Sequence, residues 1–553
     1  MALVHVVVRD ISSRQRKKSE KMLLEILAVF LVGFLLLYRY VTKSFDKWKK
    51  LGVPYKPGSF PSGSFPFFTK RRNFGDHIEK LCNEFKDEKF FGAFMFGKPV
   101  LIVNDVELLK AIKVKDFNHF TDTQDEHIST NMRSGGELDA LFNHHIGNAK
   151  GDEWKDTRST FSPVFTSGKM KRMVKYIEDV SQKLLVEMEK KTDIDEEFEL
   201  KDLTGKFSLD ALASCAFGIN FNSYGSEENS AFVKNAASIF KNDFKNGFGL
   251  MFKFIPGVVK IYEFFNISVQ HPKEVKFFRD IVIQTLNSRR ESGERRNDLV
   301  DMMLDCMKDQ EQAEHDNEDE TDQYQQDMKL SHKTKRQLTD KDIISNLMLF
   351  LIVGYDTTGM TLAYALYALS LNPDVQEKLQ QEVDEAWECA GDKLPDYNTV
   401  QGLPYLEMVI METLRMYTPA NTTLRTCTEP YTLPGTSLTL QRNDSLMFSG
   451  SFLHKDPRHW TYPDTFYPEH WSPEEKSTRS PHAFQSFGQG PRACIGMRFA
   501  QLELKVALTI LVKHLEFCPG SKTQTPLVLD PSEALGWVKG GLWAKVKRRS
   551  MHT

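Results

Sequence analysis

The feature that most constrains this fold is a long segment, residues 338–371, that is apolar almost all the way round. Thr339 and Asp342 have the spacing of a capping box, and Asn372-Pro373 follows the last apolar residue. At about 1.5 Å per residue the predicted helix is a rod of about 45 Å, which can cross a whole domain. Polar residues near its centre make a membrane span costly, so we expect a buried core helix in a large, mainly helical domain.

Composition supports one large domain with a tail. The 553 residues are 41% hydrophobic, and no composition break divides the main body. A net charge of −3 argues against nucleic-acid binding through overall charge. The seven cysteines are scattered and never in C-x-x-C spacing, which is typical of a reducing compartment and not of disulfides or zinc.

One cysteine has informative surroundings. Cys494 lies in a glycine-rich loop, residues 487–496, ahead of an apolar helix. Flanking glycines let backbone amides approach the sulfur, while the helix start and Arg492 favour thiolate over thiol. A thiolate is a strong donor for an iron centre. The alternative is an ordinary turn with an idle cysteine.

Polar residues interrupt the centre of the long helix at Gly354-Tyr355-Asp356-Thr357-Thr358-Gly359. A buried carboxylate is costly unless something uses it. Threonine hydroxyls can bond to carbonyls of the preceding turn and open the helical ladder. The segment predicts a chemical role, and the alternative is a simple polar break.

Two further pairs have helical spacing. Glu412 and Arg415 share their face with apolar residues, so we expect a buried, structural ion pair. Trp154 and Arg158 place an indole N–H and a guanidinium on one face, although alone they would indicate a surface cation–π pair. His144 and His145 have no partner pattern and are interpreted as loop residues, not ligands.

The cysteine loop resembles the haem-ligand motif F-x-x-G-x-R-x-C-x-G of the cytochrome P450 family of haem-thiolate monooxygenases. The resemblance covers roughly residue 50 to the end. Residues 158–163 and 166–170 are similar to the microsomal animal clan of families three, six and nine. The resemblance implies a mainly α fold with small β-sheets (α+β) and one large haem domain. It also implies haem b, with Cys494 as iron ligand and with Phe487, Arg492 and Gly496 around the cofactor.

The resemblance extends to the other motifs. Residues 354–359 resemble the oxygen-activation motif, in which Gly354 forms an oxygen groove and Asp356 and Thr357 relay protons. Val353 departs from the small residue expected there. Trp154 and Arg158 match W-x-x-x-R, and with Arg425 and Arg492 they are the implied partners of the haem propionates.

Glu412 and Arg415 match the family's E-x-x-R, which locks the core on the cysteine side of the haem. Its third member normally comes from P-E-R-F, but here Tyr467-Pro468-Glu469-His470-Trp471 carries His470 in place of arginine. Histidine can donate one hydrogen bond but not a bidentate fork, so the third arm of this network is in question.

The predicted organisation begins with a basic extension, residues 1–21. A transmembrane anchor at 22–42 and a proline-rich, non-helical hinge at 43–67 follow. The catalytic domain is residues 68–553, with an acidic loop predicted to be mobile at 309–335. A single-pass anchor in the endoplasmic reticulum with a cytoplasmic body is expected. The presequence-like basic residues leave a mitochondrial location as the alternative.

No flavin or nicotinamide motif is evident, so electrons come from another protein. The resemblance implies NADPH-cytochrome P450 reductase, with cytochrome b5 as a second donor. A basic group could dock such a partner, or it could be a plain solvated face: Lys155, Lys169, Lys171, Arg172 and Lys175. Phenylalanines and lysines between residues 240 and 265 suggest a surface that dips into lipid, with ordinary core as the alternative.

The predicted function is a membrane-bound monooxygenase that inserts one atom of O2 into a lipophilic substrate, such as a xenobiotic, steroid or fatty-acid-like molecule. One alternative is a family member that isomerises or dehydrates without O2, although such enzymes usually lose the acid–alcohol pair. The other alternative is a haem carrier or gas sensor. No fused sensor module is visible in the sequence, which argues against this alternative.

Overall fold

The computed structural model describes residues 2–65, 74–95, 97–124, 126–219, 223–225, 227–239, 258–296, 298–308, 338–530 and 536–549. The acidic segment 309–335 and residues 240–257 of the phenylalanine-rich segment therefore lie outside the described residues. The chain forms two compact units: residues 1–69 with 90–102, and residues 70–89 with 103–553.

The smaller unit contains helix α1 (Ala2–Thr42), helix α2 (Lys47–Lys50) and most of the strands β1 (Phe90–Met95) and β2 (Lys98–Val103). Apolar side chains from Met22 to Tyr40 are exposed on α1. The segment after it is predicted to be a non-helical hinge, but it contains the short helix α2. Trp48 of α2 is buried and donates to the Ala93 carbonyl at 2.9 Å, and the Lys56 amide donates to Gly92. The predicted hinge thus packs on strand β1 within this unit.

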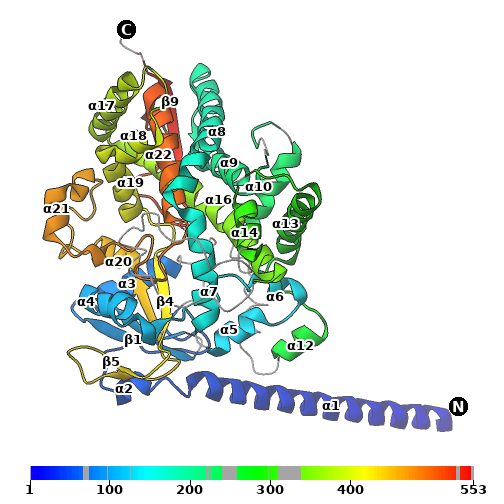
Figure 1. The fold of residues 1–553 in the computed structure, drawn as a ribbon. Helices are drawn as coiled ribbons and strands as arrows, with labels where there is room; N and C mark the ends of the chain where they lie inside the picture. Colours follow the sequence, from blue (N-terminus) through cyan, green and yellow to red (C-terminus); the bar gives the residue numbers. More distant parts are fainter. Residues whose placement is uncertain are drawn as a thin grey trace. The chain divides into compact units, whose positions relative to one another are not determined.

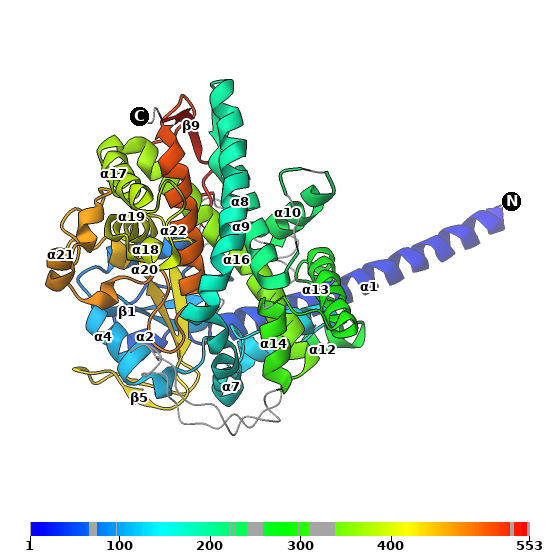
Figure 2. The same cartoon turned by 45° about the horizontal axis from the view of Figure 1, so that its top comes forward.

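The larger unit is built around helix α16 (Asp340–Leu371), as the sequence predicts. Thr339 is its N-cap, and both hydrogen bonds of the capping box with Asp342 are present. The helix packs on α9 (Leu200–Leu212), α13 (Pro272–Ser292), α19 (Pro404–Met416) and α22 (Met497–His514). In Figures 1 and 2, α16 lies among these helices in the middle of the unit. Its most apolar window is 67% buried, whereas that of the span Glu20–Lys50 is 0% buried.

The remaining helices surround this centre. They are listed here with their bounds: α3 (Phe74–Glu84), α4 (Val106–Lys110), α5 (Glu126–Arg133), α6 (Glu137–Phe142), α7 (Gly151–Phe161), α8 (Ser167–Asp193), α10 (Glu227–Ile239), α12 (Val258–Phe264), α14 (Leu299–Lys308), α17 (Pro373–Cys389), α18 (Tyr397–Gly402), α20 (Gly450–His454) and α21 (Pro473–Thr478). Helix α8 packs against both α9 and α22, so α8, α9, α16 and α22 form one helical core.

The β structure of the larger unit is small. Strands β4 (Thr422–Thr426) and β7 (Ser445–Ser449) pair antiparallel, with Arg425 opposite Leu446. Strands β3 (Phe198–Glu199), β9 (Trp543–Arg548) and β8 (Leu515–Cys518) form a second sheet, and β5 (Tyr431–Thr432) pairs with β6 (Thr439–Leu440). The prediction of a mainly α domain with small sheets is confirmed.

Candidate active site

The loop that carries Cys494 leads directly into α22, whose N-cap is Gly496. The Cys494 amide donates to the Phe487 carbonyl at 2.8 Å, which closes the loop on itself. Gly488 and Gly490 have φ values of 72° and 70°, and a Cβ on Gly490 would lie 1.9 Å from the Lys113 carbonyl oxygen. The backbone geometry therefore requires glycine at position 490.

Cys494 is exposed to a cavity of about 430 Å³ inside the larger unit. The cavity lies between α16 and the cysteine loop, and its walls are mainly apolar. They include Ile146, Phe165, Met173, Leu212, Ala216, Leu299, Leu349, Phe350, Leu414, Pro419 and Ala420. Phe487 and Gly496 line it too, so the structure brings these two predicted residues together with the cysteine.

Burial raises the pKa of the Cys494 thiol, while the Gly496 amide and Arg158 lower it by a smaller amount. The Gly496 amide at the helix start favours the thiolate, as predicted, and the nearby positive charge comes from Arg158 and not from Arg492. Desolvation of a sulfur anion outweighs them.

Helix α16 presents its polar centre to the same cavity. Val353, Gly354 and Thr357 all line it, and Thr357 Oγ1 donates to the Val353 carbonyl at 2.9 Å. A Cβ on Gly354 would lie 2.9 Å from Leu212 Cδ2, so the groove beside this residue is narrow. The Val353 side chain, which departs from the family pattern, is 39% exposed and occupies part of the cavity wall.

Asp356 is not among the residues that line the cavity. Its carboxylate is fully buried and forms an ion pair with Lys201 of α9 at 2.5 Å. Trp537 Nε1 donates to its other oxygen at 3.0 Å. The acid and the alcohol of the motif therefore lie on different sides of α16.

Two arginines mark one edge of the cavity. Arg425 on β4 and Arg492 in the cysteine loop both line it. The Arg492 guanidinium lies 4.2 Å from the centre of the Trp154 ring and donates to the carbonyls of Thr121, Ile146 and Ala149.

Trp154 and Arg158 are both buried on α7, so the alternative of a surface cation–π pair is wrong. They lie next to the arginine-lined edge without lining the cavity themselves.

This edge fits an anionic group. Burial lowers the pKa of Arg425 to about 10, and burial with the neighbouring Arg425 and Arg158 charges lowers that of Arg492 to about 9. Within the described part of the chain, Arg425 Nε has no hydrogen-bond partner. Buried cations without acids are costly, and two carboxylates at this edge would offset that cost. The sulfur, the apolar walls and the cationic edge together match a haem with its propionates.

Below the cavity, Glu412 and Arg415 form the predicted buried pair on α19, with two hydrogen bonds of 2.9 and 2.8 Å. Arg415 also donates to the carbonyls of His454, Pro463 and Thr465. His470 Nδ1 lies 3.1 Å from Glu412 Oε1, and Trp471 Nε1 donates to Oε2 at 3.0 Å. Although burial raises the pKa of Glu412, bonds from His470 and Arg415 lower it overall.

The third arm of this network is therefore present. His470 supplies one hydrogen bond where the family's arginine would supply a fork, and Trp471 supplies a second. Arg479 lies over the Trp460 and Trp471 rings, 4.2 and 4.9 Å from their centres, and donates to the His470 carbonyl. A guanidinium thus remains beside the network, supplied from nine residues further along the chain.

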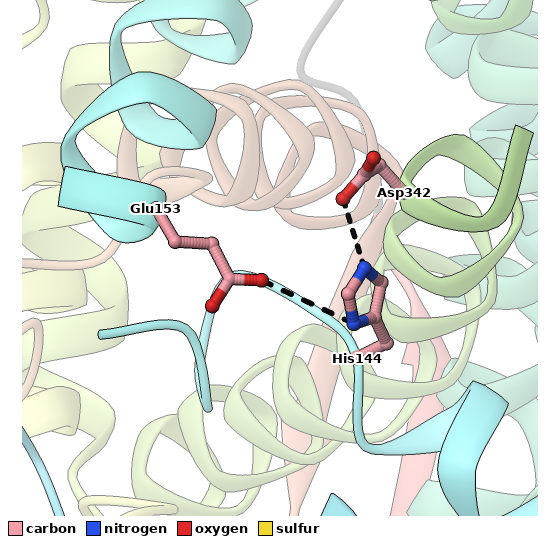
Figure 3. A group of neighbouring side chains, drawn as sticks. All are labelled: His144, Glu153 and Asp342. Carbon is pink, nitrogen blue, oxygen red and sulfur yellow. Dashed lines mark hydrogen bonds and ion pairs between the residues drawn. The ribbon is translucent and has the colours of Figure 1, made fainter. Parts of the chain in front are cut away.

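His144, Glu153 and Asp342 form a separate cluster (Figure 3). His144 Nε2 lies 3.0 Å from Asp342, and Nδ1 lies 4.0 Å from Glu153. Arg133 already binds both Glu153 oxygens, at 2.7 and 2.9 Å, and Asp342 belongs to the capping box. The cluster therefore ties the loop after α6 to the first turn of α16.

Sequence comparison agrees with this geometry. The family model described as Cytochrome P450 matches residues 56–542. The chain is 34% identical to cytochrome P450 3A11 of Mus musculus, over 92% of this chain and 94% of that protein. It is 32% identical to cytochrome P450 9e2 of Blattella germanica (94% and 98%) and 31% identical to cytochrome P450 6a8 of Drosophila melanogaster (92% and 96%).

The cavity, its cysteine and its cationic edge define a haem-dependent oxidoreductase. The chain belongs to the cytochrome P450 family, whose members are haem monooxygenases that use O2 and a redox partner. Relatives from families three, six and nine are among the most similar, as the sequence motifs predict.

Three residues near the site were not found from sequence. Lys201 and Trp537 hold Asp356, and Glu503 is a fully buried acid on α22 whose pKa burial raises well above its usual range. Each of these three residues is far along the chain from the motif at residues 354–359, next to which it lies. The amphipathic periodicity of α9 and α22 gives no signal that a charged residue there faces inward.

The Glu412 network generates a test. We expect His470→Leu to lower the free energy of unfolding by about 1–3 kcal/mol, because it leaves a buried carboxylate oxygen with one donor fewer. His470→Gln, which keeps an N–H donor, should lose less. Urea unfolding followed by haem absorbance measures both. His459→Leu is the control, because His459 is partly buried and makes no described bond to Glu412. Equal losses in all three would contradict a specific role for His470.

Proposed function

We propose that this protein is a membrane-bound monooxygenase that inserts one oxygen atom from O2 into a lipophilic substrate. The observation that carries the proposal is the meeting of Cys494, Thr357 and Gly354 at one apolar cavity. They come from two elements far apart in sequence. Cys494 is the proposed ligand of haem b, held at its propionates by Arg425, Arg492, Trp154 and Arg158.

Bound haem supplies O2 binding and reduction, with electron donation through the sulfur. The protein's own residues manage protons and exclude water. Thr357 Oγ1 holds its proton at the cavity wall, where it can pass it to an oxygen beside Gly354. Asp356 is the proposed second member of the relay: its carboxylate would accept a proton from water and pass it on towards Thr357 by movement within its Lys201 and Trp537 contacts.

The cavity walls favour a lipophilic substrate. They are largely aliphatic and aromatic, and the polar groups are concentrated near the cysteine and the arginines. Val353 adds bulk above the groove beside Gly354 and restricts how a substrate approaches it. Ile261, Phe264 and Phe265 of α12 and the segment after it are exposed, with Phe264 at 82%. We propose that they lie in lipid next to a route for apolar substrates.

Membrane attachment is proposed through α1. The span Glu20–Lys50 has a mean hydropathy of 2.2 in its most apolar window and buries none of it. Such a helix is long enough to cross a bilayer. The proposed location is the endoplasmic reticulum membrane with a cytoplasmic catalytic domain. The alternative is a mitochondrial location, because the basic residues before the span resemble an organelle presequence. Localisation of the tagged protein would distinguish the two.

Electrons are proposed to come from NADPH-cytochrome P450 reductase, with cytochrome b5 as a second donor. Lys171 and Arg172 of α8 are exposed, whereas Lys155 and Lys175 form ion pairs on their own helices. Lys171 and Arg172 are therefore the better candidates for contact with an acidic partner. An attraction of this kind raises the association rate and weakens with salt.

The haem ligand is tested by Cys494→His. We expect the wild-type protein, reduced and bound to carbon monoxide, to show the red-shifted Soret band of an anionic sulfur ligand, and the variant to lose it. Cys427→Ser is the control, because the Cys427 thiol donates to the Glu429 carbonyl and does not line the cavity. A red-shifted band that persists in Cys494→His would overturn the assignment.

The proton role is tested by Thr357→Ala. Since the variant lacks the hydroxyl at the cavity wall, we expect a larger share of the NADPH electrons to appear as hydrogen peroxide while haem still binds. NADPH consumption, peroxide and product are measured together with a panel of lipophilic substrates. Thr361→Ala, one turn further along α16, should divert fewer electrons. Unchanged product per NADPH in Thr357→Ala would remove the relay role, and turnover without NADPH would favour an isomerase or dehydratase.

The partner surface is tested by charge reversal. We expect Lys171→Glu with Arg172→Glu to slow reduction by the reductase at low ionic strength, because attraction becomes repulsion. The effect should shrink as salt is added. Stopped-flow reduction under carbon monoxide measures it, with Lys190→Glu near the other end of α8 as the control. A rate that neither salt nor charge reversal changes would exclude this face.

A further inference from the structure

A buried lysine lies behind the cationic edge of the cavity. Lys113 belongs to a π-helical turn, Ala111–Lys115, that continues α4 without a break. Its side chain is fully buried. A π turn inserts an extra residue into a helix, changes the direction of the side chains that follow, and is frequent at functional sites. Here it accompanies an inward-facing ammonium group.

The contacts of this lysine reach the cavity wall. Lys113 Nζ donates to Thr423 Oγ1 at 2.6 Å and to Gln485 Oε1 at 2.8 Å. Both of these residues line the cavity. The ammonium also lies 4.4 Å from the centre of the Phe448 ring. All three partners are neutral, and Lys113 forms no ion pair with any described acid.

The surroundings of Lys113 are positively charged. Burial, and after it the charge of Arg425, lower the pKa of Lys113 well below its usual range. Arg425 also lowers the pKa of Arg492. One carboxylate, Asp122, lies 3.9 Å from Arg492. Two guanidiniums, of Arg425 and Arg492, and the Lys113 amine thus lie near one edge, and an anion placed there would favour the charged form of Lys113.

We infer that Lys113 is an additional positioning residue for the carboxylate edge of the haem and acts on it through Thr423 and Gln485. The inference rests on the proposed haem site and adds to it a residue that none of the motifs contains. The group that Lys113 helps to recognise is a pair of carboxylates, the same group that Arg425 and Arg492 are proposed to bind. Because Lys113 uses Thr423 Oγ1 as an acceptor, the hydroxyl hydrogen of Thr423 stays available to the cavity.

A structural alternative has the same contacts. The Lys113 carbonyl lies where a Cβ on Gly490 would be, so this residue also packs against the cysteine loop. Lys113 could then hold α4 to the loop and have no influence on the cofactor. The two roles differ in the haem properties that they predict.

The test compares wild-type holoenzyme with Lys113→Met. We expect haem to transfer from the variant to apomyoglobin about tenfold faster, since a charge-assisted hydrogen-bond network is lost. We also expect a more negative Fe(III)/Fe(II) midpoint potential, because a positive charge near the haem is removed. The propionate bending band in the resonance Raman spectrum should shift as well.

Lys513→Met is the matched control. Lys513 is also a largely buried lysine, but it pairs with Asp384 at 3.1 Å and does not line the cavity. We expect it to lose stability and keep the wild-type potential and propionate band. If Lys113→Met does not accumulate, Lys113→Gln removes the charge and keeps a polar tip, and the same three measurements apply.

The outcomes separate the two proposals. Faster haem loss together with a lower potential and a shifted propionate band supports the role of Lys113. A wild-type potential and band in the variant overturn it, even where haem is lost faster, and assign Lys113 to packing alone. A wild-type protein without a thiolate spectrum overturns the proposed haem site itself, and that result is read before any variant is made.

Discussion

The accumulation of buried positive charge at one edge of the cavity is the constraint on which the site depends. Arg425 and Arg492 are both largely withdrawn from water, and the described ion pairs give them one acid, Asp122, which lies 3.9 Å from Arg492. Removing an ion from water costs several kcal/mol even after the protein relaxes. A chain that keeps such a cluster needs an anion to complete it. Dianionic haem meets that need, so electrostatics and the cysteine select the same cofactor in one cavity.

Helix α16 also carries polar groups through an apolar core, and it places them on different sides of the helix. It must cross an apolar core, yet it carries an acid and hydroxyls at its centre. The carboxylate of Asp356 is neutralised on one side by Lys201 and Trp537, while Thr357 faces the cavity on the other. Each group therefore has a partner or a function, and neither remains as an unpaired charge beside the substrate.

Much of the fold and of the site could be predicted from local patterns. The capping box at Thr339, the buried pair at Glu412 and Arg415, and the glycine-rich loop each depend on residues that are close in sequence. What escaped prediction depends on tertiary contacts. Lys201 lies on α9 and Lys113 in the π-helical turn after α4, and only the packing of these segments shows that both lysines face inward. The net direction of the Cys494 pKa escaped prediction for the same reason, since desolvation depends on the whole cavity and not on the loop.

The departure at His470 shows how such a network tolerates substitution. Glu412 needs enough donors to remain charged at zero exposure, and the identity of each donor matters less than their number. Arg415, the Tyr467 amide, His470 and Trp471 together supply five hydrogen bonds. Arg479 restores a guanidinium close by, stacked on the indoles of Trp460 and Trp471. The Trp471 indole thus supplies a hydrogen bond that the arginine would have made, and Arg479 supplies its positive charge. The Glu412 network is retained by a different set of residues.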